Sequence, residues 1–142
     1  MPQEVSVFME NRPGKLERVT ELLAGAAVNI RAITIGDNGD FGVLKLLVDD
    51  PVRAREALAA GGVVAALKNV VAVRVRDCPG GLLEVVRALR RLKINLEDAY
   101  GFVVRGGEEA IFVFQVATPG QTARALEAEG FALLEESDLY RP

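Results

Sequence analysis

The chain of 142 residues contains no histidine and only one cysteine, Cys78. Without histidine there is no Ser-His or Cys-His nucleophile pair and no imidazole to bind a transition metal. One cysteine is too few for an internal disulfide and, with histidine also missing, for a structural zinc site. We therefore expect no catalytic residues, no metal and no cofactor, and the chain is not predicted to be an enzyme.

Excess basic charge and long apolar runs are lacking as well. The formal net charge is −3 and the sequence pI is about 5.1, which argues against nucleic acid or an anionic membrane as a partner. No apolar run approaches the roughly 18 residues of a membrane span, and the first residues do not resemble a signal peptide. Half of the residues are hydrophobic and 26% are charged, so we predict a folded protein with a cytoplasmic location.

What the chain does contain is an internal repeat. Asn11-Arg12-Pro13-Gly14-Lys15-Leu16 returns as Asp77-Cys78-Pro79-Gly80-Gly81-Leu82, an offset of 66 residues (79 − 13 = 66). The same offset relates further pairs, which are Val19 and Val85, Leu23 and Leu89, Asn29 and Asn95, and Leu46 and Phe112. A period of this length exceeds the roughly 20–50 residues of solenoid repeats and indicates a duplicated domain.

Hydrophobic periodicity predicts the elements of the first copy. Alternation over residues 5–9 predicts a strand, and helical spacing from Leu16 to Leu23 predicts a helix that begins at Pro13-Gly14. Asn38-Gly39 is typical of the centre of a hairpin turn. The remaining predicted elements are strands at 28–35 and 41–49, a helix at 51–60 and a strand within 63–76.

The second copy is predicted to begin within the same extended run, without a linker. Its further predicted elements are a helix at 81–92, strands at 94–104 and 110–117, a helix at 121–129 and a closing strand at 131–136. Each copy is then a βαββαβ unit of the α+β class, a ferredoxin-like sandwich with a four-stranded antiparallel sheet and two helices on one face. We predict domains at 1–69 and 70–142.

Apolar residues are predicted on both faces of the third strand of each copy. Leu44, Leu46 and Val48 are expected to face the helices. The alternate apolar residues are Val43, Leu47, Ile111 and Val113. A sheet covered on one face only should carry polar residues on the other, so we predict that a second chain or the other copy covers this face, and we expect a homodimer.

The repeated loop joins a strand to the start of a helix, where unpaired N–H groups can bind a carboxylate. Gly14 and Gly80 would allow a ligand to approach the backbone closely. The nearby polar side chains are those of Asn11, Asp77, Asn29 and Asn95. Asn11 and Asp77 can accept hydrogen bonds from helix N–H groups or bind the ammonium group of a ligand. Asn29 and Asn95 each carry both a donor and an acceptor. This mixture of donors and acceptors suits a zwitterion.

The two loops, taken with Val28-Asn29-Ile30 and Ile94-Asn95-Leu96, resemble the signature of ACT domains, small regulatory modules that bind amino acids. The resemblance covers almost the whole chain as two tandem copies, similar to the stand-alone tandem ACT-domain proteins of prokaryotes. It implies that ACT units pair side by side, with ligand between the Pro-Gly loop of one unit and the second strand of its neighbour. The ligand-binding residues that it implies are Asn11, Pro13, Gly14, Leu16, Asn29, Ile30, Asp77, Pro79, Gly80, Leu82, Asn95 and Leu96.

One departure from the family pattern concerns the end of the first helix of each copy. ACT units commonly have glycine just before the hydrophobic-Asn pair, whereas this chain has Ala27 and Lys93. A helix that ends on a left-handed residue prefers glycine. We therefore predict an altered or strained turn at both places, and a second pocket whose charge or access is changed by Lys93.

The resemblance implies a small-molecule-sensing regulatory protein that binds a free amino acid and acts on a metabolic enzyme or another regulator. The alternative left open is a non-catalytic regulatory or oligomerisation subunit of an amino-acid biosynthetic enzyme, without a ligand response of its own. An acylphosphatase-like enzyme is disfavoured because the paired phosphate loop, Arg and Asn of that family are missing. RNA binding is rejected because the RNP1-like run Asp40-Phe41-Gly42-Val43 is not repeated in the second copy.

Overall fold

The computed structural model describes residues 1–140, apart from the side chains of Asn38 and Tyr140, and the chain forms two compact units. The N-terminal unit comprises Gln3–Lys68. The C-terminal unit comprises the chain from Asn69 onward together with Met1 and Pro2. These first two residues join it through a hydrogen bond, which the Val70 N–H donates to the Pro2 carbonyl oxygen at 3.0 Å.

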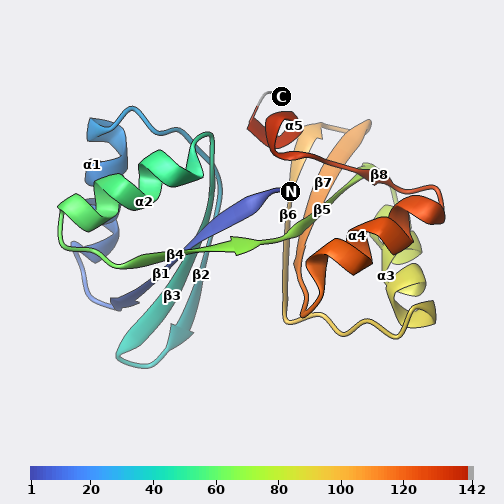
Figure 1. The fold of residues 1–142 in the computed structure, drawn as a ribbon, viewed down its shortest axis with the longest axis horizontal. Coiled ribbons are helices and arrows are strands. Elements are labelled where there is room, and N and C mark those ends of the chain that lie inside the picture. The colour runs from blue at the N-terminus through green and yellow to red at the C-terminus, as the bar shows by residue number, and fades with distance from the viewer. Residues whose placement is uncertain (141–142) are drawn as a thin grey trace. The chain divides into compact units, whose positions relative to one another are not determined.

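Both units follow the same order of elements, and the second unit has one further helix, α5, at its end (Figure 1). The first six elements are β1 Gln3–Glu10, α1 Lys15–Gly25, β2 Ile30–Asn38, β3 Phe41–Val48, α2 Pro51–Ala60 and β4 Ala65–Asn69. The elements that follow are β5 Val71–Arg76, α3 Gly81–Arg91, β6 Asp98–Arg105, β7 Glu109–Gln115, α4 Pro119–Ala128, β8 Ala132–Leu133 and α5 Glu136–Tyr140.

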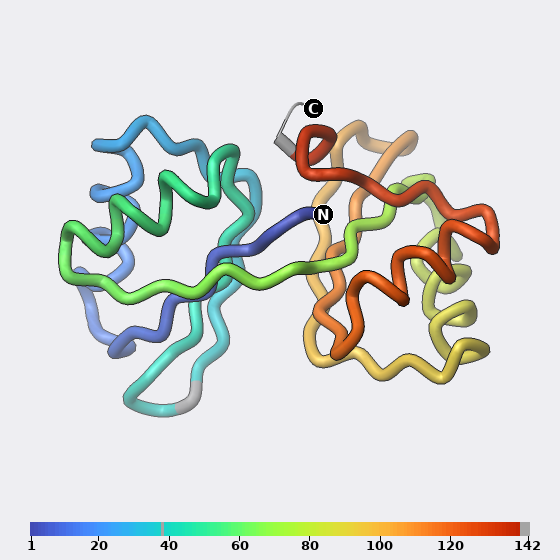
Figure 2. The backbone as a smooth tube through the Cα atoms, in the orientation of Figure 1, coloured from blue at the N-terminus to red at the C-terminus, as the bar shows by residue number. Residues whose placement is uncertain are grey.

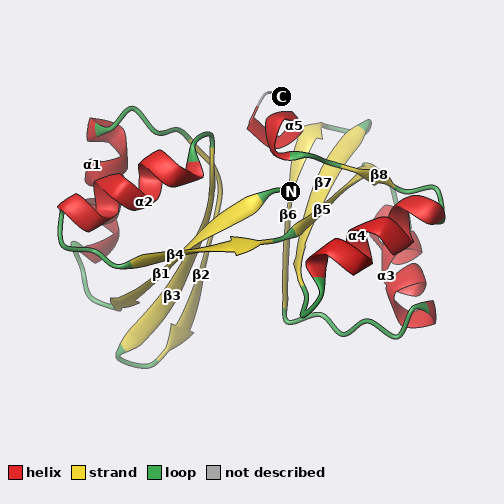
Figure 3. Ribbon diagram, viewed as in Figure 1, coloured by secondary structure: helices red, strands yellow, loops and turns green. Residues whose placement is uncertain are grey.

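Each unit is a four-stranded antiparallel sheet with helices against one face (Figure 3). The strand orders are β2-β3-β1-β4 and β6-β7-β5-β8. The predicted fold class, two tandem ferredoxin-like βαββαβ units, is thereby confirmed. Among the described residues, no helix combines the length and the apolar character needed to cross a lipid bilayer.

Several element boundaries differ from the sequence prediction. The predicted strand at 94–104 begins only at Asp98, because residues 94–97 form a loop. The first hairpin has Gly39-Asp40 as its two loop residues, since Asn38 already pairs with Phe41, so the prediction of Asn38-Gly39 at the turn centre is wrong. The short helix α5 was not predicted at all.

The offset between the copies changes from 66 to 68 residues at the second hairpin. Val7 pairs with Leu44 and Val73 pairs with Phe112, so the counterpart of Phe112 is Leu44 rather than the predicted Leu46. The cause is the longer β6–β7 connection. A register shift follows the pair Val103–Ala110, and the last pair of this hairpin is Arg105 with Glu109. Figure 2 shows the path of the β2–β3 hairpin. Because side chains alternate along a strand, a shift of two residues keeps every side chain on its predicted face.

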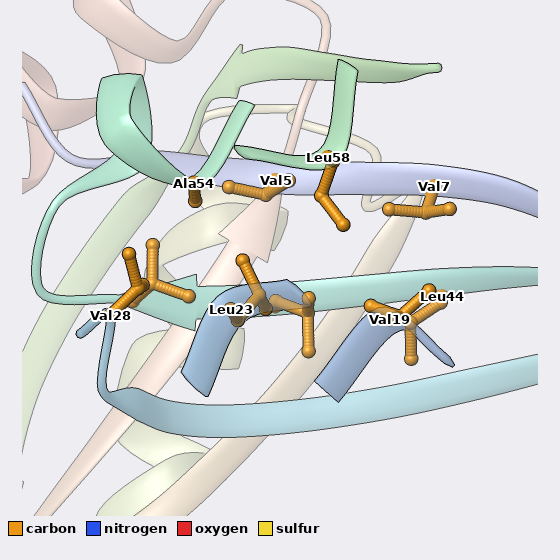
Figure 4. Close-up of a cluster of buried hydrophobic side chains, with 10 residues drawn as sticks. Val5, Val7, Val19, Leu23, Val28, Leu44, Ala54 and Leu58 are labelled. Atoms are coloured by element: carbon orange, nitrogen blue, oxygen red, sulfur yellow. The ribbon is translucent and has the colours of Figure 1, made fainter. Parts of the chain in front are cut away.

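The core of each unit lies between its sheet and its helices. In the N-terminal unit the third strand contributes Leu44, Leu46 and Val48, all fully buried, as predicted. Figure 4 shows eight labelled members of this cluster, which are Val5, Val7, Val19, Leu23, Val28, Leu44, Ala54 and Leu58. The corresponding cluster of the C-terminal unit is Val71, Val73, Val85, Ala88, Leu89, Phe114, Val116 and Leu126. The first helices, α1 and α3, are therefore fixed to their sheets by their apolar faces.

Candidate functional site

The Pro-Gly pair forms the same tight turn in both units. Lys15 N–H donates to the Arg12 carbonyl oxygen at 3.2 Å, and Gly81 N–H donates to the Cys78 carbonyl oxygen at 3.1 Å. Gly14 and Gly80 both have a φ of 90°. Proline at the second position and a positive φ at the third define a type II turn. Glycine is therefore required at the third position, and each turn leads directly into a helix.

Both helices begin without a side-chain cap. Gly14 occupies the N-cap position of α1 and Gly80 that of α3, and neither N-cap makes a side-chain hydrogen bond. The prediction that Asn11 or Asp77 caps the helix is therefore wrong, because both lie three residues too early in the chain. The first N–H groups of a helix lack intrahelical partners, so an uncapped start favours an anion.

Asn11 instead binds the neighbouring hairpin. Its Nδ2 donates to Asp37 Oδ1 at 3.2 Å, and the same oxygen accepts the Gly39 N–H at 3.0 Å. Asn11 N–H also donates to the Asp40 carbonyl oxygen at 2.8 Å. The Pro-Gly loop of the N-terminal unit is thus held to the tip of the β2–β3 hairpin by both main chain and side chain.

Asp77 plays the corresponding part in the C-terminal unit. Gly107 N–H donates to Asp77 Oδ2 at 2.7 Å, and Asp77 N–H donates to the Glu108 carbonyl oxygen at 3.2 Å. The hairpin partner of Asp77 is an N–H donor, whereas the hairpin partner of Asn11 is a carboxylate oxygen. A carboxylate therefore suits position 77 and an amide donor suits position 11. Both side chains position the loop, and a ligand-binding role for either remains a prediction.

The end of α1 contains the strained turn that the sequence predicts. Ala27 has a φ of 57°. Its N–H donates to the Ala24 carbonyl oxygen at 3.0 Å, and Val28 N–H donates to the Leu23 carbonyl oxygen at 2.9 Å. These two bonds and the buried Leu23–Val28 contact make a Schellman motif, which normally places glycine where Ala27 stands.

The end of α3 repeats this geometry at Lys93. Its φ is 58°, and its N–H donates to the Arg90 carbonyl oxygen at 3.0 Å. Ile94 N–H donates to the Leu89 carbonyl oxygen at 2.9 Å. The Lys93 side chain is exposed. Both units therefore have a non-glycine residue in left-handed backbone shortly before Asn29 or Asn95, where such strain costs about 1–2 kcal/mol.

Asn29 and Asn95 follow these turns with exposed side chains. Asn29 is fixed through its main chain, because its N–H donates to Asp49 Oδ1 at 2.9 Å and its carbonyl oxygen accepts the Asp49 N–H at 3.0 Å. Asn95 lies in the 94–97 loop before β6. Both amides are accessible to a ligand.

Three of the four leucine and isoleucine residues in the predicted site also pack against a hydrophobic core. Leu16 and Ile30 pack against the core of the N-terminal unit, and Leu96 packs against that of the C-terminal unit. Leu82 differs, since 39% of it is exposed. Of the four, Leu82 is therefore the residue most available to contact a ligand or a partner.

The predicted residues of one unit fall into two groups at opposite ends of a helix. Gly14 stands at the start of α1 and Asn29 follows its end, and α1 has 11 residues. At 1.5 Å per residue such a helix is about 16 Å long. Gly80 and Asn95 are separated in the same way by the 11 residues of α3. A free amino acid is too small to bridge either pair, so a site that uses both groups needs two different units.

A cavity of about 370 Å³ adjoins the second Pro-Gly loop. Pro79 and Gly80 line it, together with Arg74, Arg76 and Glu84, which the sequence did not indicate as site residues. The equivalent cavity of the N-terminal unit, about 500 Å³, contains none of the predicted residues. These cavities could be found only from the fold, because the walls of each combine segments that are distant in the sequence.

Two tandem βαββαβ units with the same Pro-Gly helix start define a duplicated ferredoxin-like protein. A family model described as an ACT domain pair matches residues 2–141, so the chain belongs to the family of ACT domain pairs.

Solved structures show the same fold. The crystal structure of protein BT0572 from Bacteroides thetaiotaomicron is similar to this chain with a TM-score of 0.92 and 31% identity, covering 99% of this chain and 96% of that chain. The ligand-free regulatory subunit of aspartate kinase from Thermus thermophilus has a TM-score of 0.65 and 17% identity, covering 91% and 93% of the two chains. No curated protein sequence gives a significant match.

Proposed function

We propose that this protein is a non-catalytic regulator that binds a free amino acid between ACT units and transmits the bound state to a metabolic enzyme or another regulator. Membership of the ACT domain pair family supports the regulatory role. The observation that carries the ligand proposal is the pair of uncapped helix starts at Gly14 and Gly80. In the proposed site the ligand carboxylate binds one such helix start, and the ammonium binds the exposed amide oxygen of Asn29 or Asn95 of a neighbouring unit.

The separation of the two groups by a whole helix supports an interface site. Since α1 is about 16 Å long, one unit supplies either the carboxylate half or the ammonium half of a pocket. The duplication and the pairing of units would then be needed for binding.

We expect that at least one of the twenty amino acids raises the melting temperature, because a ligand that binds only the folded state stabilises it by RT ln(1 + [L]/Kd). The measurement is a thermal-shift titration of the full chain at millimolar ligand. The amide of the active amino acid should give no shift, since it lacks the carboxylate. Asn29→Ala and Asn95→Ala report on the two pockets separately, and each exposed substitution should change the stability of the free protein by less than about 0.5 kcal/mol. The proposal is wrong if no amino acid shifts the transition, or if both variants respond as the wild type does.

A homodimer is the second part of the proposal. Ile33 and Ile35 on the edge strand β2 are 46% and 45% exposed, although they share a face with the core residues Leu46 and Leu44. An edge strand with exposed apolar side chains is suited to pairing with another copy.

We therefore expect Ile35→Lys to convert a dimer into monomers, measured as mass by sedimentation equilibrium. Val52→Lys is the matched control, because Val52 is similarly exposed at 47% but lies on α2. A wild type that sediments as a monomer, or equal effects of both variants, would contradict the β2 interface.

The alternative is a regulatory or oligomerisation subunit without its own ligand response. The exposed edge at Ile33 and Ile35 favours it as much as it favours a sensor. Co-purification of a defined enzyme with the chain, together with no thermal response to any amino acid, would select this alternative.

A further inference from the structure

The edge strands β2 and β6 carry side chains of different size on the sheet face that the helices cover. Ile33 and Ile35 of β2 lie on this face and are 46% and 45% exposed. The equivalent positions of β6, 66 residues further on, are Ala99 and Gly101. A Cβ atom at position 101 would lie 2.5 Å from the ring of Phe112, so only glycine leaves room for this ring. The edge at β2 therefore projects two bulky side chains, whereas the edge at β6 has small residues at these positions.

The flank of α1 that lies toward β2 has small side chains. Helix α2 contacts β1 and β3, and α4 contacts β5 and β8, so α1 and α3 lie toward β2 and β6. Leu22 faces α2, because its side chain closes the space at Gly61, where α2 ends. Thr20 and Ala24 are each two residues from Leu22 and therefore about 160° from it around the helix axis. Since the Thr20 hydroxyl donates to the Leu16 carbonyl oxygen at 3.0 Å, this flank is small and largely apolar.

The flank of α3 that lies toward β6 is bulky instead. Arg91 marks the opposite side of this helix, because it binds Glu129 at the end of α4 at 2.7 Å. Leu82 and Val86 lie about 180° and 140° from Arg91 around the axis, and they are 39% and 40% exposed. Leu83 beside them is 47% exposed. The two units therefore have opposite size patterns, with a bulky strand beside a small helix flank in one and a small strand beside a bulky helix flank in the other.

The charged residues on these two flanks have opposite signs. Glu17 lies three residues before Thr20 on the flank of α1, and Arg90 lies four residues after Val86 on the flank of α3. Both side chains are exposed. The two cations of α1 and the one acid of α3, Glu84, lie on the other side of their helices, within about 40° of the residue that contacts the neighbouring helix. The flank of the N-terminal unit is thus acidic and that of the C-terminal unit is basic.

We propose that the β2–α1 side of the N-terminal unit binds the β6–α3 side of the C-terminal unit of a second copy. This inference rests on the homodimer proposed above and specifies which surfaces meet in it. Ile33 and Ile35 then lie against the small residues of β6, and Leu82 and Val86 lie against the small flank of α1. Glu17 of one copy faces the basic flank of α3 in the other. Pairing of two like units would instead oppose two bulky strands or two bulky helix flanks, and equal charges.

The partner surface has to belong to another copy, because a single residue, Val70, joins β4 to β5. If β2 paired with β6 of the same chain, the strands would follow the order β4-β1-β3-β2-β6-β7-β5. Six spacings of about 4.8 Å would then separate β4 from β5 by about 29 Å. The chain from Asn69 to Val71 spans at most about 7 Å. Two copies have no such restriction, and since each copy carries both surfaces, they can exchange two equivalent contacts around a two-fold axis.

The test mixes two full-length variants, Ile35→Lys, which alters the N-terminal surface, and Val86→Glu, which alters the C-terminal surface. Each variant alone should weaken the dimer at least about tenfold, because every contact then includes one altered surface. An equimolar mixture should recover dimer, because one of its two contacts joins two unaltered surfaces. Sedimentation equilibrium measures the mass. Val52→Glu is the matched control, since Val52 is 47% exposed on α2, and it should dimerise as the wild type does.

Pairing of like units predicts different results. A dimer that uses only the N-terminal units would leave Val86→Glu dimeric, and contacts between like units at both surfaces would give no recovery on mixing. Either result overturns this inference while the homodimer stands, whereas a monomeric wild type overturns both. The thermal response to amino acids is measured separately, so failure of the ligand proposal is distinguishable from failure of this inference.

Charge reversal provides a second measurement on exposed positions. Glu17→Arg and Arg90→Glu should each weaken the dimer at least about fivefold, because like charges then meet at both contacts. The double variant should recover to within about threefold of the wild type, since opposite charges meet again. Arg18→Glu is the matched control on the α2 side of α1 and should leave the dimer unchanged. Losses that simply add in the double variant overturn the inference.

Discussion

Replacing Gly81 with alanine is expected to lower the free energy of unfolding by about 2–3 kcal/mol, the upper part of the range for overpacking a buried site. Gly81 is the first residue of α3 and is buried. A Cβ atom there would overlap the carbonyl oxygen of Arg76, a main-chain atom. That oxygen accepts the Cys78 N–H at 3.0 Å, and Arg76 pairs with Glu109 at the end of β5. The clash therefore has to be relieved by moving the strand or the turn.

The matched control is the equivalent position of the other unit, where Lys15 already carries a side chain. Lys15→Ala is expected to change stability by less than about 0.5 kcal/mol. Denaturant unfolding followed by far-UV circular dichroism, with hydrogen exchange to separate the two units, measures both variants. Similar costs for the two substitutions would contradict the clash between a Cβ atom at position 81 and the Arg76 carbonyl oxygen.

Local signals in the sequence were sufficient to predict most of the fold. Helix α2 was predicted with its observed bounds, Pro51–Ala60, because proline begins it and Gly61-Gly62 follow its end. Asp50 caps this helix by accepting the Arg53 N–H at 3.1 Å. Such signals act within a few residues, so they can be read without knowing the rest of the structure.

The unequal hairpins were not found because alternation hides an insertion of two residues. With a period of two, the helix-facing pattern of Leu44 and Leu46 matches Ala110 and Phe112 as well as it matches Phe112 and Phe114. Only the strand register shows which alignment is correct.

The roles of Asn11 and Asp77 depend on partners far along the chain. Asn11 binds Asp37, 26 residues away, and Asp77 binds Gly107, 30 residues away. A polar residue just before a helix fits a cap equally well in the sequence. The side-chain pairs Phe8–Phe41 and Arg74–Glu109 have the same origin, because their members become neighbours only through strand pairing.

The strained helix ends lead to the second prediction of large effect, a gain in stability. Ala27→Gly and Lys93→Gly remove a left-handed alanine and a left-handed lysine, each worth about 1–2 kcal/mol of strain. Glycine offsets about 0.4–1 kcal/mol of this gain, because it increases the conformational entropy of the unfolded chain. The net gain is about 0.5–1 kcal/mol for each variant, and since the two sites lie in different units, the double variant should gain about 1–2 kcal/mol.

The chain supplies its own reverse control for this prediction. Helices α2 and α4 end in the same Schellman geometry with glycine in place, at Gly62 and Gly130, whose φ values are 80° and 94°. Apart from the adjacent residues, no heavy atom of the described part of the chain lies within 4 Å of a Cβ added at either position, so Gly62→Ala and Gly130→Ala test backbone strain without a clash. Each should cost about 1 kcal/mol in denaturant unfolding. If the glycine variants at 27 and 93 were neutral while these controls were costly, the strain at Ala27 and Lys93 would have to be relieved by contacts of their own. Because both residues precede the exposed amides of Asn29 and Asn95, a stabilised double variant with a weaker amino-acid response would link that strain to ligand binding.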